Sequence, residues 1–214
     1  MPHASSSLSR PGPPSPRPPS RTPKPRSCPS DQSNTRVIAT ISTPRLELVP
    51  FDPTALKHLV RGDRPQAQHI LGIQLPDEFP TPGELAGFLP IQLHRMEAAP
   101  DRRGWMARLI VTRTDREMVG HCGFHGPPDV IGRAEIGYTV FTPFRGQGFA
   151  KEAAQALVQY AFARGETEVF ATVSPANAPS LAVVRALGFI QVGTQEDEVD
   201  GLELVFAVRA NHPP

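Results

Sequence analysis

A glycine-containing turn leads directly into an alanine-rich helical pattern in the stretch FRGQGFAKEAAQALVQYAF, residues 144–162. Small and apolar residues recur there at helical spacing over three turns, so one face of the predicted helix packs on a sheet. Strand patterns precede it at 134–140 and follow it at 168–173. This order predicts a β-α-β crossover between two parallel strands. The packed positions are Ala150, Ala153, Ala154, Leu157, Val158, Ala161 and Phe162.

Short helical and strand patterns fill the rest of the chain from residue 37 onward. Asp52-Pro53 and Thr81-Pro82 are typical helix starts, and Pro90 is expected to interrupt the second of these helices. The expected elements follow a clear order: helices come first, then a run of antiparallel strands, one crossover and a closing hairpin. This order predicts an α+β fold with helices on both faces of the sheet. The expected helices are 52–61, 64–72, 81–98 and 177–187, and the further strands are 45–49, 105–112, 118–124, 189–193 and 202–209.

Residues 1–36 differ sharply in composition from the rest of the chain. They hold ten of the 26 prolines, nine serines, six Lys or Arg and one acid, Asp31. So few large apolar residues cannot offset the entropy of ordering, which predicts a disordered tail and one folded domain over 37–214. A transit peptide is the alternative, although the prolines argue against the amphipathic helix that it needs. No apolar run approaches the roughly 20 residues that span a bilayer, so no membrane partner is expected.

The charge balance of the predicted domain points away from nucleic acid. The chain has a net charge of +1, but residues 37–214 hold 16 Lys or Arg and 20 Asp or Glu. A net charge of −4 disfavours nucleic-acid binding and suits a cationic small molecule or peptide. Because one of the two cysteines, Cys28, lies in the tail and the other is Cys122, no structural disulfide is expected, and the predicted compartment is the cytoplasm.

Gly146 and Gly148 leave the backbone at the start of the Ala-rich helix uncovered by side chains. A helix N-terminus presents unpaired N–H groups with partial positive charge, and Arg145 adds a full charge. This combination predicts a cradle for phosphate or pyrophosphate. The spacing fits neither a Walker loop nor the G-x-G-x-x-G dinucleotide motif. A glycine-rich turn without a ligand is the alternative that spacing leaves open.

Several motifs in order resemble the GNAT superfamily of N-acetyltransferases. The run Arg145-Gly146-Gln147-Gly148-Phe149-Ala150 resembles the family's R/Q-x-x-G-x-G/A signature, and the strand at 134–140 resembles its fourth strand. Other segments resemble the RimJ/RimL branch of ribosomal-protein alanine acetyltransferases, and the resemblance covers about residues 41–208. These segments are Thr43-x-Arg45-Leu46-x-Leu48, Glu152, Asn177-x-x-Ser180 and Leu187-Gly188-Phe189.

The resemblance implies direct transfer of an acetyl group from acetyl-CoA to an amine. It implies a mostly antiparallel, twisted sheet that splays between the family's fourth and fifth strands, where the acetyl group sits. The pantetheine arm would pair with the backbone of Tyr138, Thr139 and Val140, and the N–H of Val140 would polarise the thioester carbonyl. The pyrophosphate would bind Arg145, Gly146, Gln147, Gly148, Phe149 and Ala150, while Asn177 would touch the pantetheine and Arg185 the adenosine 3′-phosphate.

An ammonium acceptor must lose a proton before it attacks, which calls for a base. Glu135 is the candidate, because flanking apolar residues are expected to bury it and raise its pKa. A salt-bridged strand residue and a chain of waters are the alternatives. The family often uses a tyrosine to assist the leaving thiolate, but no tyrosine follows Tyr160. Ser180 is expected to take that role, unless it only caps a helix.

Cys122 is expected in the core, so a Cys-His nucleophile with His121 or His125 is disfavoured. The seven histidines lack the spacing of metal ligands, and no metal is expected. The acceptor pocket, by resemblance, includes the early helices, the loop after Phe124 and the last hairpin. Acids that line this pocket would favour a peptide N-terminus or a polyamine, and a solvated acidic loop is the alternative for 196–200. The acids in those regions are Asp77, Glu78, Glu84, Glu196, Asp197 and Glu198.

Two other functions stay open from the sequence. One is a small-molecule acetyltransferase that acts on an amino sugar, polyamine or antibiotic. The other is a CoA-binding sensor or interaction module with weak catalysis, which an intact Glu135 and Ser180 disfavour. A monomer and a homodimer are both compatible with the sequence.

Overall fold

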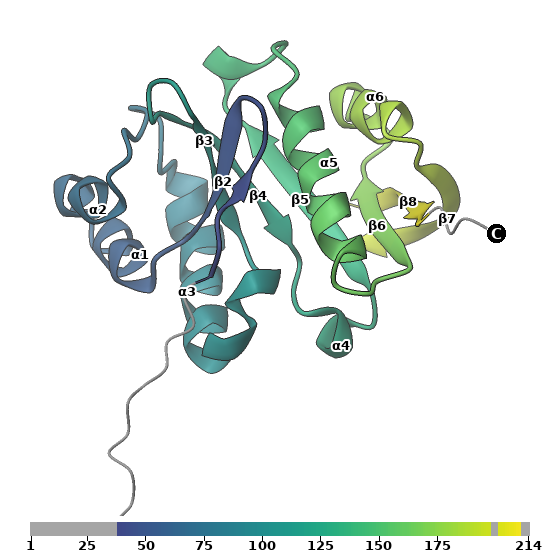
Figure 1. The fold of residues 1–214 in the computed structure, drawn as a ribbon, viewed down its shortest axis with the longest axis horizontal. Coiled ribbons are helices and arrows are strands. Elements are labelled where there is room, and N and C mark those ends of the chain that lie inside the picture. Colours follow the sequence, from purple (N-terminus) through teal and green to yellow (C-terminus); the bar gives the residue numbers. More distant parts are fainter. Residues whose placement is uncertain (1–37, 198–200, 211–214) are drawn as a thin grey trace, which may run out of the picture. The chain divides into compact units, whose positions relative to one another are not determined.

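A computed structural model describes residues 38–197 and 201–210. Its strands form one sheet in the order β1-β2-β3-β4-β5-β6-β8-β7 (Figure 1). β5 and β6 run parallel, and every other neighbouring pair of strands is antiparallel. The mostly antiparallel α+β prediction is therefore confirmed. The strands are β1 (Ile41–Ser42), β2 (Leu46–Pro50), β3 (Arg108–Thr112), β4 (Met118–Phe124), β5 (Ala134–Val140), β6 (Glu168–Val173), β7 (Ile190–Asp197) and β8 (Gly201–Arg209).

β5 and β6 separate soon after they begin. Their pairing consists of Ala134 with Val169 and Glu135 with Phe170. β5 continues to Val140 beyond the second of these pairs, and β6 continues to Val173. These are the strands predicted at 134–140 and 168–173, so the predicted splay lies at the predicted place.

Helices cover both faces of the sheet, as predicted. α5 (Phe149–Phe162) connects β5 to β6 and lies on one face together with α6 (Ala178–Ala186) (Figure 1). Its small residues Ala153 and Ala154 are fully buried against the strands, which lets the helix approach the sheet closely. The other face carries a second core beneath α1 (Pro53–Val60), α2 (Arg64–Leu71) and α3 (Leu89–Ala98).

The early helices begin at the predicted capping residues. The side chain of Asp52 accepts hydrogen bonds from the N–H groups of Thr54 and Ala55 at the start of α1. Thr81 and Glu84 form a reciprocal capping box, in which each side chain accepts from the other residue's N–H. The expected interruption at Pro90 is wrong, because a π-helical turn, Glu84–Phe88, leads continuously into α3. Such a wider turn accommodates a residue that lacks an N–H.

Trp105 does not start a strand, contrary to the prediction. It ends a 3₁₀ segment, Pro100–Trp105, and its ring contacts Phe124 and Tyr160. β3 begins three residues later at Arg108, whose guanidinium is fully buried and donates to the carbonyls of Ala39, Leu48 and Gly104. Two further short helical segments, Pro128–Ile131 (α4) and Thr142–Phe144, lie in connections where no helix was predicted.

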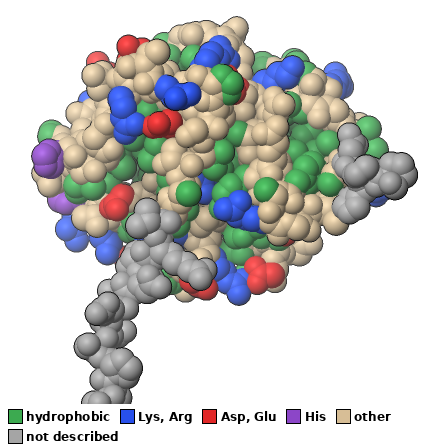
Figure 2. All heavy atoms as spheres, in the orientation of Figure 1, with side chains coloured by type: hydrophobic (Ala, Val, Ile, Leu, Met, Phe, Trp, Pro, Cys, Tyr) green, Lys and Arg blue, Asp and Glu red, His purple; other side chains and the backbone are tan. Residues whose placement is uncertain are grey.

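Lys and Arg side chains lie among Asp and Glu side chains on the face seen in Figure 2. No helix within 38–197 and 201–210 is long and apolar enough to cross a bilayer.

The predicted tail, 1–36, and the acid Glu198 lie outside the described residues. The boundary of the folded domain at residue 37 therefore stays a prediction.

Candidate active site

The turn before α5 holds its backbone in a conformation that suits glycine. Gly146 and Gly148 have φ angles of 77° and 80°, in the left-handed region that side chains disfavour. Gly148 is the N-cap of α5, and no side chain of the described residues caps this helix. The first N–H groups of α5 therefore lack a side-chain acceptor, and they carry the positive end of the helix dipole.

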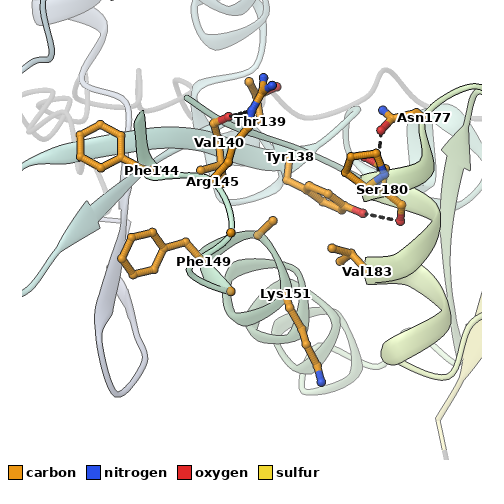
Figure 3. A pocket seen from close by; sticks show the side chains of 14 residues that line it. Tyr138, Thr139, Val140, Phe144, Arg145, Phe149, Lys151, Asn177, Ser180 and Val183 are labelled. Carbon is orange, nitrogen blue, oxygen red and sulfur yellow. Dashed lines mark hydrogen bonds between the residues drawn. The ribbon is translucent and has the colours of Figure 1, made fainter. Parts of the chain in front are cut away.

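A cavity of about 710 Å³ lies along this turn and the end of β5 (Figure 3). It is lined by most of the residues predicted to bind acetyl-CoA, and also by Ser180. Gln147 and Arg185 are not among the lining residues, and Arg185 is exposed on α6, so contact of these two with CoA stays a prediction. The predicted residues on its wall are Tyr138, Thr139, Val140, Arg145, Gly146, Gly148, Phe149, Ala150, Asn177 and Ser180.

The backbone of β5 can pair with a ligand where β6 has moved away. Phe141 N–H donates to the carbonyl of Val119, and the carbonyl of Glu135 accepts from His125 N–H. Backbone groups alternate in direction along an antiparallel strand, so Tyr138 and Val140 direct theirs away from β4 and into the gap. This geometry fits the strand-like pairing predicted for the pantetheine arm. Arg145 Nε donates to the carbonyl of Val140 at 3.0 Å.

Arg45 holds the glycine turn from outside the cavity. Its Nη1 donates to the carbonyl of Gln147 at 2.9 Å, and its Nε donates to Glu152 Oε2 at 2.7 Å. The other oxygen of Glu152 accepts from Thr43 Oγ1 at 2.6 Å and from the N–H of Arg45. Partial burial would raise the pKa of Glu152, but these hydrogen bonds lower it overall. The sequence motifs contain these residues, but no role had been predicted for them.

A second cavity, of about 240 Å³, occupies the gap between β5 and β6. It shares Tyr138, Asn177 and Ser180 with the first cavity. Ala171 and Val173 of β6 are buried in the α5 core, so Thr172 between them faces the opposite side of the sheet. Thr172 lines the second cavity together with His125. The gap therefore links the first cavity to the face that carries α1–α3.

Glu135 lies beside this gap in a saturated hydrogen-bond network. Oε2 accepts from Arg133 Nε at 2.7 Å, and Oε1 accepts from Thr172 Oγ1 at 2.6 Å. His125 Nδ1 lies 3.4 Å from the same Oε1. Burial alone would raise the pKa of Glu135, but His125, Thr172 and Arg133 together bring it to about 2.

The expectation of a raised pKa for Glu135 is therefore wrong. A carboxylate of such low pKa accepts a proton poorly from an ammonium group. Glu135 also lines neither of the two cavities. The structure agrees better with the salt-bridged alternative, and the assignment of Glu135 as the base stays an untested prediction.

Ser180 and Asn177 have different tasks at the start of α6. Asn177 Oδ1 accepts from the N–H of Ser180 at 3.1 Å, so Asn177 is the cap and Ser180 is not. Figure 3 marks a second contact, in which Tyr138 Oη donates to the backbone carbonyl of Ser180 at 3.3 Å. The Ser180 side chain makes no hydrogen bond with any other described residue. Its hydroxyl is available to a ligand in either cavity.

Four residues on the wall of the first cavity were missed by the sequence reasoning: Phe144, Lys151, Pro179 and Val183. Lys151 lies in the first turn of α5, directly after the predicted anion loop. Figure 3 shows its side chain extended away from that loop along the helix. A basic residue in the first turn of the helix after the predicted anion loop was the available signal, and Lys151, unlike Arg185, lines the cavity.

Cys122 is core, as predicted, with 2% of its surface exposed. Burial raises the pKa of its thiol to about 12, so a thiolate nucleophile is disfavoured. Residues 38–197 and 201–210 contain no group of three or more His, Cys, Asp or Glu arranged to hold a metal ion.

The acids predicted for the acceptor pocket lie in several environments. Glu84 belongs to the capping box and also lies 3.2 Å from His121 Nε2. Together with Glu78, these two residues line a cavity of about 820 Å³ that shares Thr139 and Arg145 with the first cavity. Asp77 is exposed in the connection between α2 and the π-helical turn, and Glu196 is exposed on β7.

Comparison with known proteins gives a consistent family. Residues 45–190 match the acetyltransferase (GNAT) domain family. YjdG of Bacillus subtilis, described as an uncharacterized N-acetyltransferase, is 30% identical over 151 residues, which cover 70% of this chain and 89% of YjdG. The uncharacterized N-acetyltransferase p20 of Bacillus licheniformis is 40% identical over 90 residues, which cover 42% of this chain. The match spans half of p20.

A solved structure shares the fold at lower identity. RimL, the ribosomal L7/L12 alpha-N-protein acetyltransferase in complex with coenzyme A, aligns with a TM-score of 0.55 and 20% identity. The alignment covers 80% of this chain and 98% of RimL. The predicted family is therefore confirmed, and the chain belongs to the GNAT family of acetyl-CoA-dependent N-acetyltransferases.

Proposed function

We propose that this chain transfers the acetyl group of acetyl-CoA to the α-amine of a peptide or protein N-terminus. The observation that carries the proposal is the gap between β5 and β6, because it joins the CoA cavity to the opposite face of the sheet. An amine can then approach the thioester from the side that CoA leaves free. The fold shared with RimL, whose name states an α-N-protein acetyltransferase, supports the choice of acceptor.

The residues of the first cavity fit acetyl-CoA, which supplies the activated acetyl group when bound. The N–H groups at the turn and at the start of α5 would hold the pyrophosphate, with the charge of Arg145 nearby. The backbone of Tyr138 and Val140 would hold the pantetheine arm in extended conformation. The N–H of Val140 would stabilise the oxyanion that forms on the thioester carbonyl, and each such donor contributes about 100-fold or more to the rate.

In this proposal, Ser180 assists the leaving thiolate. It lies where the two cavities meet, and Asn177 fixes its backbone through the cap of α6. A serine hydroxyl is a weak acid, so its task in this proposal is a hydrogen bond to sulfur, with proton donation second. Tyr138 Oη does not take that task in the structure, because it donates to the carbonyl of Ser180.

A small cationic amine is the second candidate acceptor. The cavity of about 820 Å³ beside the π-helical turn combines Glu78 and Glu84 with the rings of Phe88 and Phe141. Its size suits a small molecule, and the exposed carboxylate of Glu78 can attract a cation, whereas Glu84 already pairs with His121, whose ring stacks on Phe88. A cytoplasmic location, and the choice between a monomer and a homodimer, stay predictions.

Calorimetric titration with acetyl-CoA, combined with an assay of thiol release, tests the proposal. The acceptor probes are tetrapeptides that begin with Ser or Ala, the same peptides with a blocked N-terminus, spermidine and glucosamine. We expect binding of acetyl-CoA and thiol release with the free peptides but not with the blocked ones. Release with spermidine or glucosamine alone would favour the second candidate. Binding without release on any probe would support a CoA sensor, and absence of binding would refute the whole proposal.

We also propose that residues 37–214 suffice for this activity. Deletion of residues 1–36 is expected to leave the melting temperature and the Kd for acetyl-CoA unchanged. A lower melting temperature would show that the first residues belong to the folded domain.

A further inference from the structure

His125 lines the cavity in the gap between β5 and β6, and it lies beside the carboxylate of Glu135. We propose that His125 accepts the proton of the attacking ammonium and that Glu135 positions its imidazole ring. This inference rests on the proposed function, since it assigns a residue to the same transfer reaction.

The geometry gives the two ring nitrogens of His125 different roles. Nδ1 lies 3.4 Å from Glu135 Oε1, and a carboxylate at that position favours the tautomer with hydrogen on Nδ1. Nε2 then keeps its lone pair. A carbon added to Gly137 as Cβ would lie only 2.7 Å from Nε2, so this nitrogen rests directly over β5 where β6 has moved away.

His125 and Ser180 line the same cavity in the gap. His125, the proposed base for the amine, and Ser180, the proposed hydrogen-bond donor to the thiolate, therefore reach one small cavity from opposite faces of the sheet. The His125 side chain is 54% exposed, so its proton can pass to solvent after each turnover.

The charged groups around His125 come from three elements. Arg133 directly precedes β5 and pairs with Glu135, the second residue of that strand, so their charges largely offset. Glu203 of β8 lines the same cavity and accepts from Gln195. Arg95 of α3 donates to the backbone carbonyl of His125 and not to its ring.

Other residues are less suited to take the proton. Both oxygens of Glu135 already accept hydrogen bonds, from Arg133 and from Thr172. His121 lies on the same face of β4, but it pairs with Glu84 and lines the cavity beside the π-helical turn instead of the gap. Among the described residues, His125 combines a ring nitrogen that has no hydrogen-bond partner with a place in the gap.

The proposed step conserves protons and electrons. The ammonium group gives one proton to His125 Nε2, and the lone pair that this frees attacks the thioester carbon. The C–N bond forms, the carbonyl becomes an oxyanion near Val140 N–H, and its collapse breaks the C–S bond. The second proton of the nitrogen passes to the thiolate, with Ser180 as the hydrogen-bond partner. The imidazolium of His125 then releases its proton to solvent.

The variant His125→Gln tests the assignment in the full-length chain. Its kcat/KM is measured against pH with the tetrapeptides that begin with Ser or Ala. General-base catalysis contributes at least about 100-fold, so a loss of that order is expected at pH 7. The loss is expected to shrink toward pH 9, because there the amine is already deprotonated in solution. Added imidazole is expected to restore part of the rate to His125→Ala.

Gly137→Ala provides an independent test that keeps the histidine. The new methyl group would displace the ring from its place over β5, so the pH profile should move toward that of His125→Gln. His69→Gln is the matched control, because His69 is exposed on α2 and lines neither cavity. Its profile should match the wild type, and calorimetry should give one Kd for acetyl-CoA in all of these variants.

The outcomes separate this inference from the function on which it rests. If the wild type transfers acetyl to no amine probe, both fail. The wild type can instead be active while the kcat/KM of His125→Gln is lower by the same factor at every pH and imidazole does not rescue His125→Ala. In that case His125 is not the proton acceptor, and the proposed function stands.

Discussion

Arg45 Nε lies 2.7 Å from Glu152 Oε2, which joins the loop before β2 to the first turn of α5. Nη1 of the same guanidinium donates to the carbonyl of Gln147 within the glycine turn. One side chain thus fixes both the helix and the turn that together form the proposed pyrophosphate site. Preorganisation of this kind lowers the entropy lost on binding.

Arg45→Met is therefore expected to weaken acetyl-CoA binding although Arg45 does not line the cavity. Without this bond the turn must be ordered when acetyl-CoA binds, at a cost no larger than the energy of the lost charged hydrogen bond, about 1.5–3 kcal/mol, so the Kd is expected to rise by up to about 100-fold. Arg113→Met is the matched control, since Arg113 donates to the carbonyls of Thr43 and Pro44 in the same loop but not to the glycine turn. Calorimetry on both variants checks this, and equal affinities would contradict the role of Arg45.

Gly148→Val is expected to abolish detectable acetyl-CoA binding. A branched side chain would cover the N–H groups of α5, and a φ of 80° is strained for valine by about 1–3 kcal/mol. Gly62→Val separates these two effects, because Gly62 has a φ of 81°, lies in the turn after α1 and has open space at its Cβ position. The melting temperature should fall by a similar amount in both variants, but only Gly148→Val should fail to bind acetyl-CoA. Similar affinities in the two variants would argue against the cradle.

The sequence predicted the fold and most of the residues that line the first cavity, because their signals are local. The periodicity of 144–162 and the glycines before it lie within one continuous stretch, and the splayed strands flank it. The caps of α1 and α6 follow from single polar residues at helix starts.

The electrostatics of the site could not be predicted in the same way. Thr172 comes to Glu135 from β6 and His125 from the end of β4, so the carboxylate's hydrogen bonds depend on strand order. Arg45 reaches Gln147 across about a hundred residues of sequence. A residue flanked by apolar neighbours was expected to have a raised pKa, but partners from other strands reverse the sign of the shift.

Glu135→Gln is expected to lower stability at neutral pH and to reduce the acid dependence of stability. The folded-state pKa of about 2 lies below the ordinary value of 4.5, so ionised Glu135 stabilises the fold above about pH 5. This contribution, of about 3 kcal/mol, is lost as the pH falls toward 2. Urea unfolding at several pH values measures it. Glu97→Gln is the control, since Glu97 forms an exposed pair with Lys57 that should contribute under about 1 kcal/mol. A pH dependence unchanged from the wild type in Glu135→Gln would contradict the assigned pKa.

Cys122→Ala is expected to keep the transfer activity within about twofold of the wild type, measured as kcat/KM with the peptide probes. The thiol is buried beneath α5, and its pKa of about 12 keeps it protonated at neutral pH, so it cannot act as a nucleophile. Removal of the sulfur leaves a small cavity, and a stability loss of about 1 kcal/mol is the expected cost. Val119→Ala, also in this core, serves as a control for the loss of packing. A rate loss of 100-fold in Cys122→Ala that Val119→Ala does not share would indicate that acetyl transfer passes through the thiol.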